Sequence, residues 1–359
     1  MTADSVQLGP RHEYALECTA TPEAVWRALT DPELTQRTYY GWRLDASPVA
    51  GAPYAYRAEG GAAQIEGTIL ASQPPWRLQM TARYCFDPQA RHDPPHRVTW
   101  EIAPLDHAVY GAAHSQAAGE QVAAPRCRVR VSADGFAGET VAYKLAVNDL
   151  TAVLRAIRNL LDPSALSPRR EQIGRPVIRR LTAGRLDDFL RFLDQEAFAD
   201  NPYWAHCYCT HFHHTTGAVH TAAENRAWAS ELVRAGGLQG FLAYVDGYPV
   251  GWCNAAPRAT IPRLALMPGL RVPDAERVGS IVCLLVARAY RRHGIAGLLL
   301  DAVAERFRRQ GLAFAEAYPV KELRRESEAA TPLAVYLRAG FQLHPGEGQG
   351  LIVRRALKP

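Results

Sequence analysis

Apolar residues recur along the second half of the chain with two different periods. Short continuous apolar runs indicate buried strands, and runs with a period of about 3.6 residues predict amphipathic helices. Asp246-Gly247 separates two strand-like runs and is typical of a two-residue hairpin turn. The predicted strands cover residues 176–181, 241–245, 248–255, 281–287, 312–317, 341–344 and 351–355, and the predicted helices cover 185–198, 297–309 and 332–338. This alternation predicts an α/β sheet with a hairpin at one side.

The first half has a different order of patterns. Thr21-Pro22-Glu23 combines a capping side chain, a proline and an acidic residue, which predicts the start of a short helix. A long helix is predicted near the end of this half, where one helical face is apolar: Leu150, Val153, Leu154, Ile157, Leu160 and Leu161. Between the helices lie extended runs at 54–58, 63–71, 76–84, 98–102 and 127–131, and a long hairpin loop at 103–124. The order predicts an α+β domain.

A proline-rich segment separates the two halves. Residues 162–175 contain prolines, serines and an Arg-Arg-Glu cluster, and they follow the long predicted helix directly. Proline cannot continue a helix, so the segment is interpreted as a linker. The sequence therefore predicts a domain at 1–161, a linker at 162–175 and a second domain at 176–359.

Composition narrows the classes of function. With 359 residues, 48% hydrophobic and 21% charged, the chain has the composition of a globular protein of two domains. No apolar run is long enough to span a bilayer, and no secretory signal is visible, so we expect a cytoplasmic protein without a membrane partner. A net charge of +5 suits anionic small ligands and is too small to indicate nucleic acid. Seven scattered cysteines do not indicate a disulfide framework.

The stretch Arg291-Arg292-His293-Gly294-Ile295-Ala296-Gly297 lies between a predicted strand and a predicted helix. The start of a helix leaves backbone N–H groups unpaired, and their partial positive charge suits a phosphate. Gly294 and Ala296 lack bulk where a phosphate needs close approach to the backbone. The pattern predicts a binding site for a cofactor that carries a diphosphate.

Two motifs in this half together resemble the GNAT N-acetyltransferase superfamily, over about residues 176–357. The first is R-x-x-G-x-A, formed by Arg291, Gly294 and Ala296 after an apolar strand. The second is Y-x-x-x-G-F, formed by Tyr336 and Gly340-Phe341. The resemblance implies a GNAT fold, an α/β fold with a mixed, mostly antiparallel sheet whose central strands splay apart. It also implies acetyl-CoA as the co-substrate.

The resemblance further implies the site residues. Backbone amides of residues 292–297 would hold the pyrophosphate, and backbone groups of Leu285 and Val286 would pair with the pantetheine arm. Tyr336 would protonate the departing thiolate as general acid. The implied cofactor-binding residues are Leu285, Val286, Arg291, Arg292, His293, Gly294, Ile295, Ala296 and Gly297.

The chemistry of acyl transfer adds two groups to this set. A backbone N–H such as that of Val286 would stabilise the oxyanion. A base must remove a proton from the amine, and Glu316, Glu276 and Asp274 are the candidates, with Glu316 taken as the catalytic residue. The alternative for each carboxylate is a solvated surface residue.

Residues 201–215 contain four histidines and two cysteines, which raises the question of a metal site. The Cys-x-Cys spacing is tighter than that of a structural zinc pair, and no second pair completes a tetrahedron, so we predict no metal. One alternative is that these residues only pack a helical hairpin. The interpretation adopted here is that they form the wall of the acceptor site, with Trp204, Cys207, Tyr208, Cys209 and Phe212 as the substrate-binding residues.

The order of elements in the first half resembles the START-like SRPBCC superfamily, over about residues 11–161, and within it the branch related to activators of a chaperone ATPase. The supporting stretches are Thr21–Pro32, Gly67–Leu70, Pro74–Leu78 and Val98–Glu101. The resemblance implies a helix-grip fold, a sheet wrapped around a long helix. Tyr39, Tyr40 and Trp42 form an aromatic group that would line a cavity for a hydrophobic ligand, or would be ordinary core residues.

Three hypotheses of function follow. The first is an acetyl-CoA-dependent N-acetyltransferase that modifies a primary amine of a small molecule, with the first domain binding ligand, acceptor or partner. The second is a START-like ligand-binding protein whose acetyltransferase domain is regulatory or inactive. The third gives the START-like domain an enzymatic activity of its own. The intact glycine turn together with Tyr336 favours the first.

Overall fold

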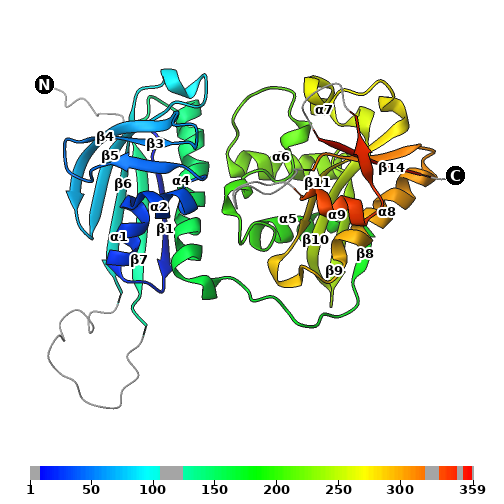
Figure 1. Cartoon of the computed structure of the whole chain (residues 1–359), viewed down its shortest axis with the longest axis horizontal. Helices are drawn as coiled ribbons and strands as arrows, with labels where there is room; N and C mark the ends of the chain where they lie inside the picture. Colours follow the sequence, from blue (N-terminus) through cyan, green and yellow to red (C-terminus); the bar gives the residue numbers. More distant parts are fainter. Residues whose placement is uncertain (1–8, 106–123, 320–330, 346–350, 358–359) are drawn as a thin grey trace, which may run out of the picture. The chain divides into compact units, whose positions relative to one another are not determined.

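The computed structural model describes residues 9–105, 124–319, 331–345 and 351–357. The chain forms two compact units, Met1–Leu166 and Ser167–Pro359, each built on one seven-stranded sheet (Figure 1). The boundary lies inside the segment predicted as a linker. Residues from Ser167 onward belong to the second unit.

The first unit is an antiparallel sheet in the order β1-β7-β6-β5-β4-β3-β2, with the long helix α4 alongside it (Figure 1). Thr140 caps α4, and the apolar face of that helix packs into the core of the sheet through residues such as Leu150 and Val153. Its elements are β1 His12–Cys18, α1 Pro22–Thr30, α2 Pro32–Thr38, β2 Arg43–Ala46, β3 Pro53–Arg57, β4 Ala63–Gln73, β5 Arg77–Tyr84, β6 His96–Pro104, β7 Cys127–Asp134 and α4 Val141–Leu161.

The second unit has the sheet order β13-β14-β12-β11-β10-β9-β8, and among the described strands only β11 and β12 pair in parallel. Asp246 and Gly247 both have positive φ and connect β9 to β10 as the predicted hairpin turn. Its elements are β8 Val177–Arg180, α5 Leu186–Gln195, α6 Ala222–Arg234, β9 Gly240–Val245, β10 Tyr248–Pro257, α7 Pro262–Leu266, β11 Val278–Val286, α8 Ile295–Arg309, β12 Phe314–Ala317, α9 Leu333–Arg338, β13 Gln342–His344 and β14 Ile352–Ala356.

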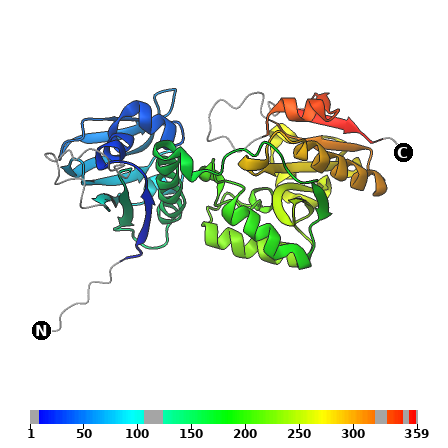
Figure 2. The same ribbon diagram turned by 90° about the horizontal axis from the view of Figure 1, so that it is seen from below.

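Helices cover both faces of the second sheet (Figure 2). Alternate residues of a strand point to opposite faces, so Leu242 and Trp252 pack against α5 and α6, whereas Ala243 and Cys253 pack against α8 and α9. The two faces therefore form separate hydrophobic cores around the same strands. This places the end of β11 between two packed layers.

The sequence predicted the class of both units correctly. The α+β first unit and the α/β second unit with a mostly antiparallel sheet are confirmed, and the predicted helix start at Thr21 is present, where the side chain accepts a hydrogen bond from the Ala24 amide at 3.2 Å. Helix α6 was missed, although Thr221 and Glu224 form a capping box at its start. The loop predicted at 103–124 lies mostly outside the described residues.

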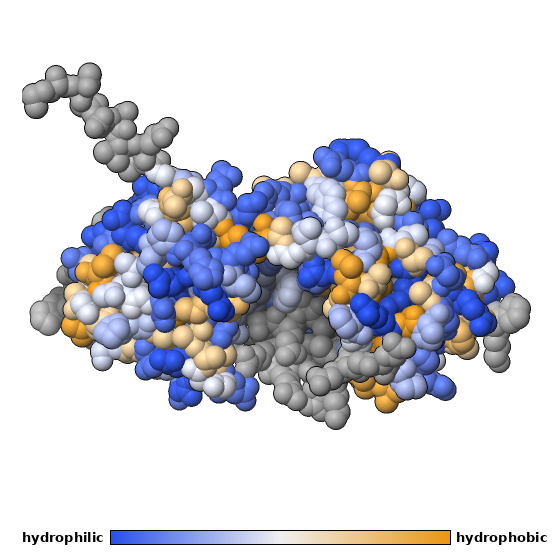
Figure 3. All heavy atoms as spheres, turned by 90° about the horizontal axis from the view of Figure 1, so that it is seen from above, coloured by the Kyte–Doolittle hydropathy of each residue, from blue (hydrophilic) through white to orange (hydrophobic). Residues whose placement is uncertain are grey.

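The surface of the described residues mixes polar and apolar side chains. On the face drawn in Figure 3, hydrophilic and hydrophobic residues alternate over each unit, as in most folded proteins. None of the described helices has the length and apolar character needed to cross a bilayer.

The core of the first unit contains an ionisable residue, Asp149 on α4. Its side chain is buried, and its Oδ1 accepts a hydrogen bond of 2.7 Å from the Tyr40 hydroxyl. Burial raises the pKa of Asp149 to about 7, although the hydrogen bonds from Tyr40 and Tyr84 oppose this shift. A carboxylate in this position costs folding free energy when it is charged.

We expect Asp149→Asn to stabilise the first unit at neutral and higher pH. An unfolded aspartate titrates near 3.8, so between about pH 4 and 7 the folded protein binds more protons than the unfolded chain, and its stability falls as the pH rises. Asparagine removes this loss, so the gain in free energy of unfolding should grow from near zero at about pH 4 to roughly 2–4 kcal/mol above pH 7. Urea unfolding at several pH values across this range measures the free energy of unfolding of both proteins. An equal dependence of that free energy on pH in the two proteins would contradict the burial argument.

Candidate cofactor and catalytic site

The pairing of β11 changes along its length. Beside β12 its register runs from Val278 opposite Phe314 to Ile281 opposite Ala317 and ends there. Beside β10 the pairing continues to Val286, with an irregularity at Asn254/Ala255. Beyond Ile281 no described strand pairs with the edge of β11 that faced β12, and this edge is called the released edge. This matches the divergence of central strands expected from the sequence.

The peptide groups at this released edge belong to Leu284 and Val286. The Ala287 amide donates to the Val250 carbonyl on β10 at 2.9 Å, and Leu285 stands opposite Trp252 in the same register. Because successive residues of a strand direct their peptide groups to opposite sides, those of Leu285 face β10. Leu285, predicted to pair with a pantetheine arm, therefore directs its peptide groups to β10, whereas Leu284 and Val286 present theirs to the other edge of β11.

Residues 287–294 connect β11 to α8, with a short 3-10 helix at Arg288–Tyr290 and a tight turn at Arg291–Gly294 just before α8. Arg292 and Gly294 have φ values of 72° and 77°, so the chain passes twice through the left-handed region before the helix begins at Ile295. Gly294 is the N-cap residue, and no side chain in the described part of the chain caps this end of α8. A Cβ added at Gly294 would meet open space. The first backbone amides of α8, those of Ile295, Ala296 and Gly297, thus lie at an accessible helix N-terminus. Their unpaired N–H groups give this end of the helix a positive electrostatic potential.

The Arg291 side chain is bound to other residues of the protein. Its guanidinium binds both carboxylate oxygens of Asp200, at 2.5 and 2.9 Å, and its Nε donates to the Val286 carbonyl at 2.9 Å. These bonds use the planar donor edge that would otherwise contact a phosphate. The predicted role of the Arg291 side chain in cofactor binding is therefore corrected: it fixes the turn to β11.

Tyr336 lies on α9 beside the released edge. Its ring is buried and packs edge to face on Phe341, with 5.5 Å between the ring centroids. Its hydroxyl interacts with Thr331, whose own hydroxyl donates to the Leu284 carbonyl at 3.2 Å. Burial, reinforced by Cys253, raises the pKa of Tyr336, so the phenol keeps its proton at neutral pH. A protonated phenol thus stands next to the gap between the strands.

Comparison with protein families agrees with this geometry. Residues 200–341 match the family model described as Acetyltransferase (GNAT) family. The second unit is a GNAT acetyltransferase domain. Residues 19–125 match the model described as Activator of Hsp90 ATPase homolog 1-like protein, so the first unit is an Hsp90-activator-like domain of the START-like SRPBCC type. Both resemblances expected from the sequence are confirmed. No curated protein matches the sequence.

Solved structures similar to parts of this chain come from both groups. An acetyltransferase of the GNAT family from Streptococcus pneumoniae is 11% identical, with a TM-score of 0.32, and the match covers 51% of this chain and 100% of that one. The Aha1 dimer from Colwellia psychrerythraea is 14% identical, with a TM-score of 0.30 and coverage of 43% and 96%. A protein from Mesorhizobium loti is 23% identical, with a TM-score of 0.31 and coverage of 43% and 100%.

The segment before the GNAT domain packs on the turn of that domain. Arg288 donates to the Ser167 carbonyl at 2.6 Å, and the Arg170 amide donates to the Ala289 carbonyl at 2.9 Å. The Arg170 guanidinium lies 4.9 Å from the centroid of the Tyr290 ring. His293, predicted to bind cofactor, donates from Nε2 to the Arg170 carbonyl at 2.9 Å. Part of the predicted linker is therefore a fixed element of this domain.

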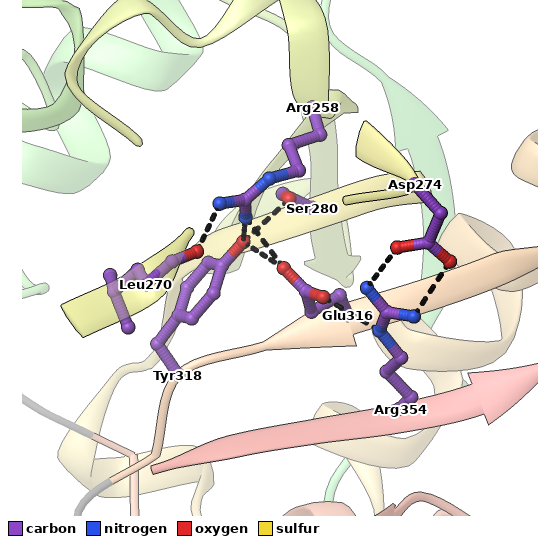
Figure 4. A network of polar contacts seen from close by, with 7 residues as sticks. All are labelled: Arg258, Leu270, Asp274, Ser280, Glu316, Tyr318 and Arg354. Atoms are coloured by element: carbon purple, nitrogen blue, oxygen red, sulfur yellow. Dashed lines mark hydrogen bonds and ion pairs between the residues drawn. The ribbon is translucent and has the colours of Figure 1, made fainter. Parts of the chain in front are cut away.

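Glu316 lies in a buried network of charges, not at the surface (Figure 4). The side chain has no exposed area, because β12 lies inside the sheet between β11 and β14. Its Oε1 accepts from Arg258 at 2.6 Å and from the Tyr318 hydroxyl at 2.5 Å, and its Oε2 accepts from Arg354 Nε at 2.7 Å. Both oxygens are occupied and an amine cannot reach them. The prediction of Glu316 as catalytic base is therefore replaced by a structural role.

The network extends to a second carboxylate. Arg354 binds both oxygens of Asp274, at 2.9 and 2.8 Å, and hydrogen bonding to this guanidinium lowers the pKa of Asp274 (Figure 4). Arg258 also donates to the Leu270 carbonyl, which ties the segment between β10 and β11 to the sheet. Of the other two carboxylates considered as catalytic base, Asp274 is therefore ion-paired with Arg354, and Glu276 is exposed to solvent.

The cysteine- and histidine-containing loop packs on the face of β10 and β11 next to α5 and α6. Cys209 donates from its thiol to Cys283 Sγ on β11 at 3.3 Å, and the Trp252 ring donates to Cys209 Sγ at 3.2 Å. The bond with Cys283, together with burial, raises the pKa of Cys209. Tyr208 is buried and donates to Asp194 at 2.6 Å. The loop therefore reaches the divergent end of β11 through Cys209.

A buried asparagine on α6 organises this loop. Asn225 Oδ1 accepts from the Thr210 hydroxyl and from His214 Nε2, each at 3.0 Å, and Asn225 Nδ2 donates to the His206 carbonyl at 2.9 Å. Trp204, Cys207 and Phe212 remain half-buried. Among the described residues, no three His, Cys, Asp or Glu side chains come together as a metal site.

Proposed function

We propose that the chain transfers the acetyl group of acetyl-CoA to a primary amine of a small molecule. One observation carries the proposal: the released edge of β11 leads, through the connection at 287–294, to the start of α8, which no described side chain caps. The first can pair with an extended amide chain, and the second attracts a diphosphate. Acetyl-CoA contains both groups, in that order from its thioester.

The residues at this site fit that co-substrate. The peptide groups of Leu284 and Val286 face the side from which pantetheine would approach, and open space surrounds the position of a Cβ at Gly294. Arg292 is exposed beside the turn and adds positive charge. When bound, acetyl-CoA supplies an activated acyl group, and the task left to the protein is to place an amine and to move protons.

We assign proton donation to Tyr336. Its phenol is protonated and interacts with Thr331, which in turn donates to the Leu284 carbonyl. The phenol can therefore give its proton to a thiolate that leaves near this edge. The Val286 amide, which faces the same gap, is suited to stabilise an oxyanion. We assign the acceptor wall to the loop that carries Trp204, Cys207, Tyr208, Cys209 and Phe212, of which Tyr208 and Cys209 are buried and the others half-buried.

Tyr336→Phe should lower kcat by about 100-fold or more, because it removes only the donated proton. Affinity for acetyl-CoA should stay nearly the same, since the hydroxyl interacts with Thr331, which is outside the turn at Gly294. Release of CoA with a panel of primary amines measures the rate, and calorimetry measures the affinity. Tyr248→Phe is the matched control, because that tyrosine is 64% exposed on a hairpin. An unaltered kcat would remove Tyr336 from the mechanism.

A further inference from the structure

Aromatic side chains in the first unit form a continuous group that reaches the surface. The rings of Tyr40 and Trp42 are 5.2 Å apart, Trp42 and Phe86 are 5.6 Å apart, and Tyr84 and Phe86 are 5.7 Å apart, measured between centroids. Trp42 is half-buried and Phe86 is 39% exposed, whereas Tyr84 is buried. Aromatic faces carry negative electrostatic potential and attract organic cations.

A carboxylate with free hydrogen-bonding capacity lies beneath this group. Asp149 Oδ1 accepts from Tyr40 and the carboxylate also interacts with the Tyr84 hydroxyl, but its Oδ2 is buried and no described residue makes a hydrogen bond of ordinary geometry with it. His96, stacked on Tyr84 with 5.5 Å between centroids, likewise has both ring nitrogens buried without a partner among those residues. Burial without a partner costs folding free energy, so such atoms in a protein core call for a ligand or another explanation.

The backbone at Tyr40 adds to this cost. Tyr40 has a φ of 53° and Gly41 a φ of 77°, so a bulky residue occupies the left-handed region in order to direct its hydroxyl at Asp149. Strain of this kind persists where the surrounding structure fixes it, and it is concentrated at binding sites. Three features thus occur at one place: aromatic rings that reach the surface, a buried carboxylate oxygen without a hydrogen bond of ordinary geometry, and a tyrosine with a strained backbone.

We propose that the first unit binds a protonated organic amine here, with its ammonium group on Asp149 and its apolar body against Tyr40, Trp42 and Phe86. An anion is disfavoured by Asp149, and a purely apolar ligand would leave Oδ2 unsatisfied. An ammonium group satisfies the carboxylate and the ring faces together. The site uses no residue of the GNAT domain, so the proposal does not depend on the proposed acetyl transfer.

The test uses the full-length protein without acetyl-CoA and compares two probes of the same shape. Phenethylamine carries an ammonium group, and 2-phenylethanol is its uncharged counterpart. Calorimetry should detect the amine and find the alcohol at least about tenfold weaker. Asp149→Asn, which preserves shape, should weaken the amine at least about tenfold. Asp45→Asn is the control, since Asp45 is an exposed aspartate of the same unit.

Two further variants of the full-length protein complete the test. Trp42→Leu, a change at the half-buried rim, should also weaken binding of the amine, and it tests the aromatic part of the site independently of Asp149. Gly294→Glu should leave the binding intact, which separates this site from any amine site next to the thioester. No detectable amine binding, equal binding of amine and alcohol, or binding unaffected by both Asp149→Asn and Trp42→Leu would each overturn the proposal.

Discussion

Gly294→Glu is expected to weaken acetyl-CoA binding by at least about 100-fold, because like charges brought into contact cost several kcal/mol. The new carboxylate would lie at the uncapped start of α8, where the diphosphate would also lie. It would compete for the same backbone amides and repel the ligand. Since a Cβ at Gly294 meets open space, the side chain itself creates no collision within the protein.

The positive φ of Gly294 means that any side chain there also adds backbone strain. A matched control therefore uses Gly311, which has a φ of 76°, close to the 77° of Gly294, and open space around its Cβ, but lies after the opposite end of α8. Gly311→Glu carries the same strain and charge away from the turn. Calorimetric titration of both variants with acetyl-CoA, after their folding has been checked by circular dichroism, isolates the local effect. Equal affinities in the two variants would refute the diphosphate site.

Glu316→Gln should destabilise the second unit by about 3–5 kcal/mol, the usual cost of removing one partner of a buried ion pair. Two guanidiniums depend on this carboxylate: Arg258 is 4% exposed and Arg354 is 8% exposed. An amide of the same shape keeps the packing and removes the charge. Urea unfolding measures the loss of free energy.

The control for this change is Glu305→Gln on the surface of α8. Glu305 also contacts two arginines, Arg308 and Arg309, but water screens these exposed pairs, so we expect no measurable change in stability. The comparison also decides between roles for Glu316. A variant that unfolds at the normal urea concentration but has lost turnover would restore Glu316 as the catalytic base.

The two motifs found in the sequence located the turn before α8 and the position of Tyr336, because they depend on local backbone. A glycine before an apolar helix predicts a left-handed residue at its start, and Gly294 has that conformation. The partners of Arg291 could not be predicted in this way. Asp200 is 91 residues distant along the chain, and only the packing of the loop before α6 brings it to the turn.

Two other corrections have a similar physical origin. Whether Leu284 or Leu285 faces the gap depends on the register between β10 and β11, which includes an irregularity at Asn254/Ala255 that no local pattern indicates. Glu316 reads as a surface carboxylate because its arginine partners, Arg258 and Arg354, come from other elements. A charge in a short apolar strand is the one local signal that could have indicated a buried pair.

The contacts of Ser167 and Arg170 bear on how this protein should be dissected into parts. A shortened chain that begins at residue 176, after the prolines, would lack both the carbonyl bound by Arg288 and the carbonyl bound by His293. Weak acetyl-CoA binding by such a fragment would then reflect damage to the turn rather than a missing activity. An autonomous acetyltransferase should be cut between Leu166 and Ser167.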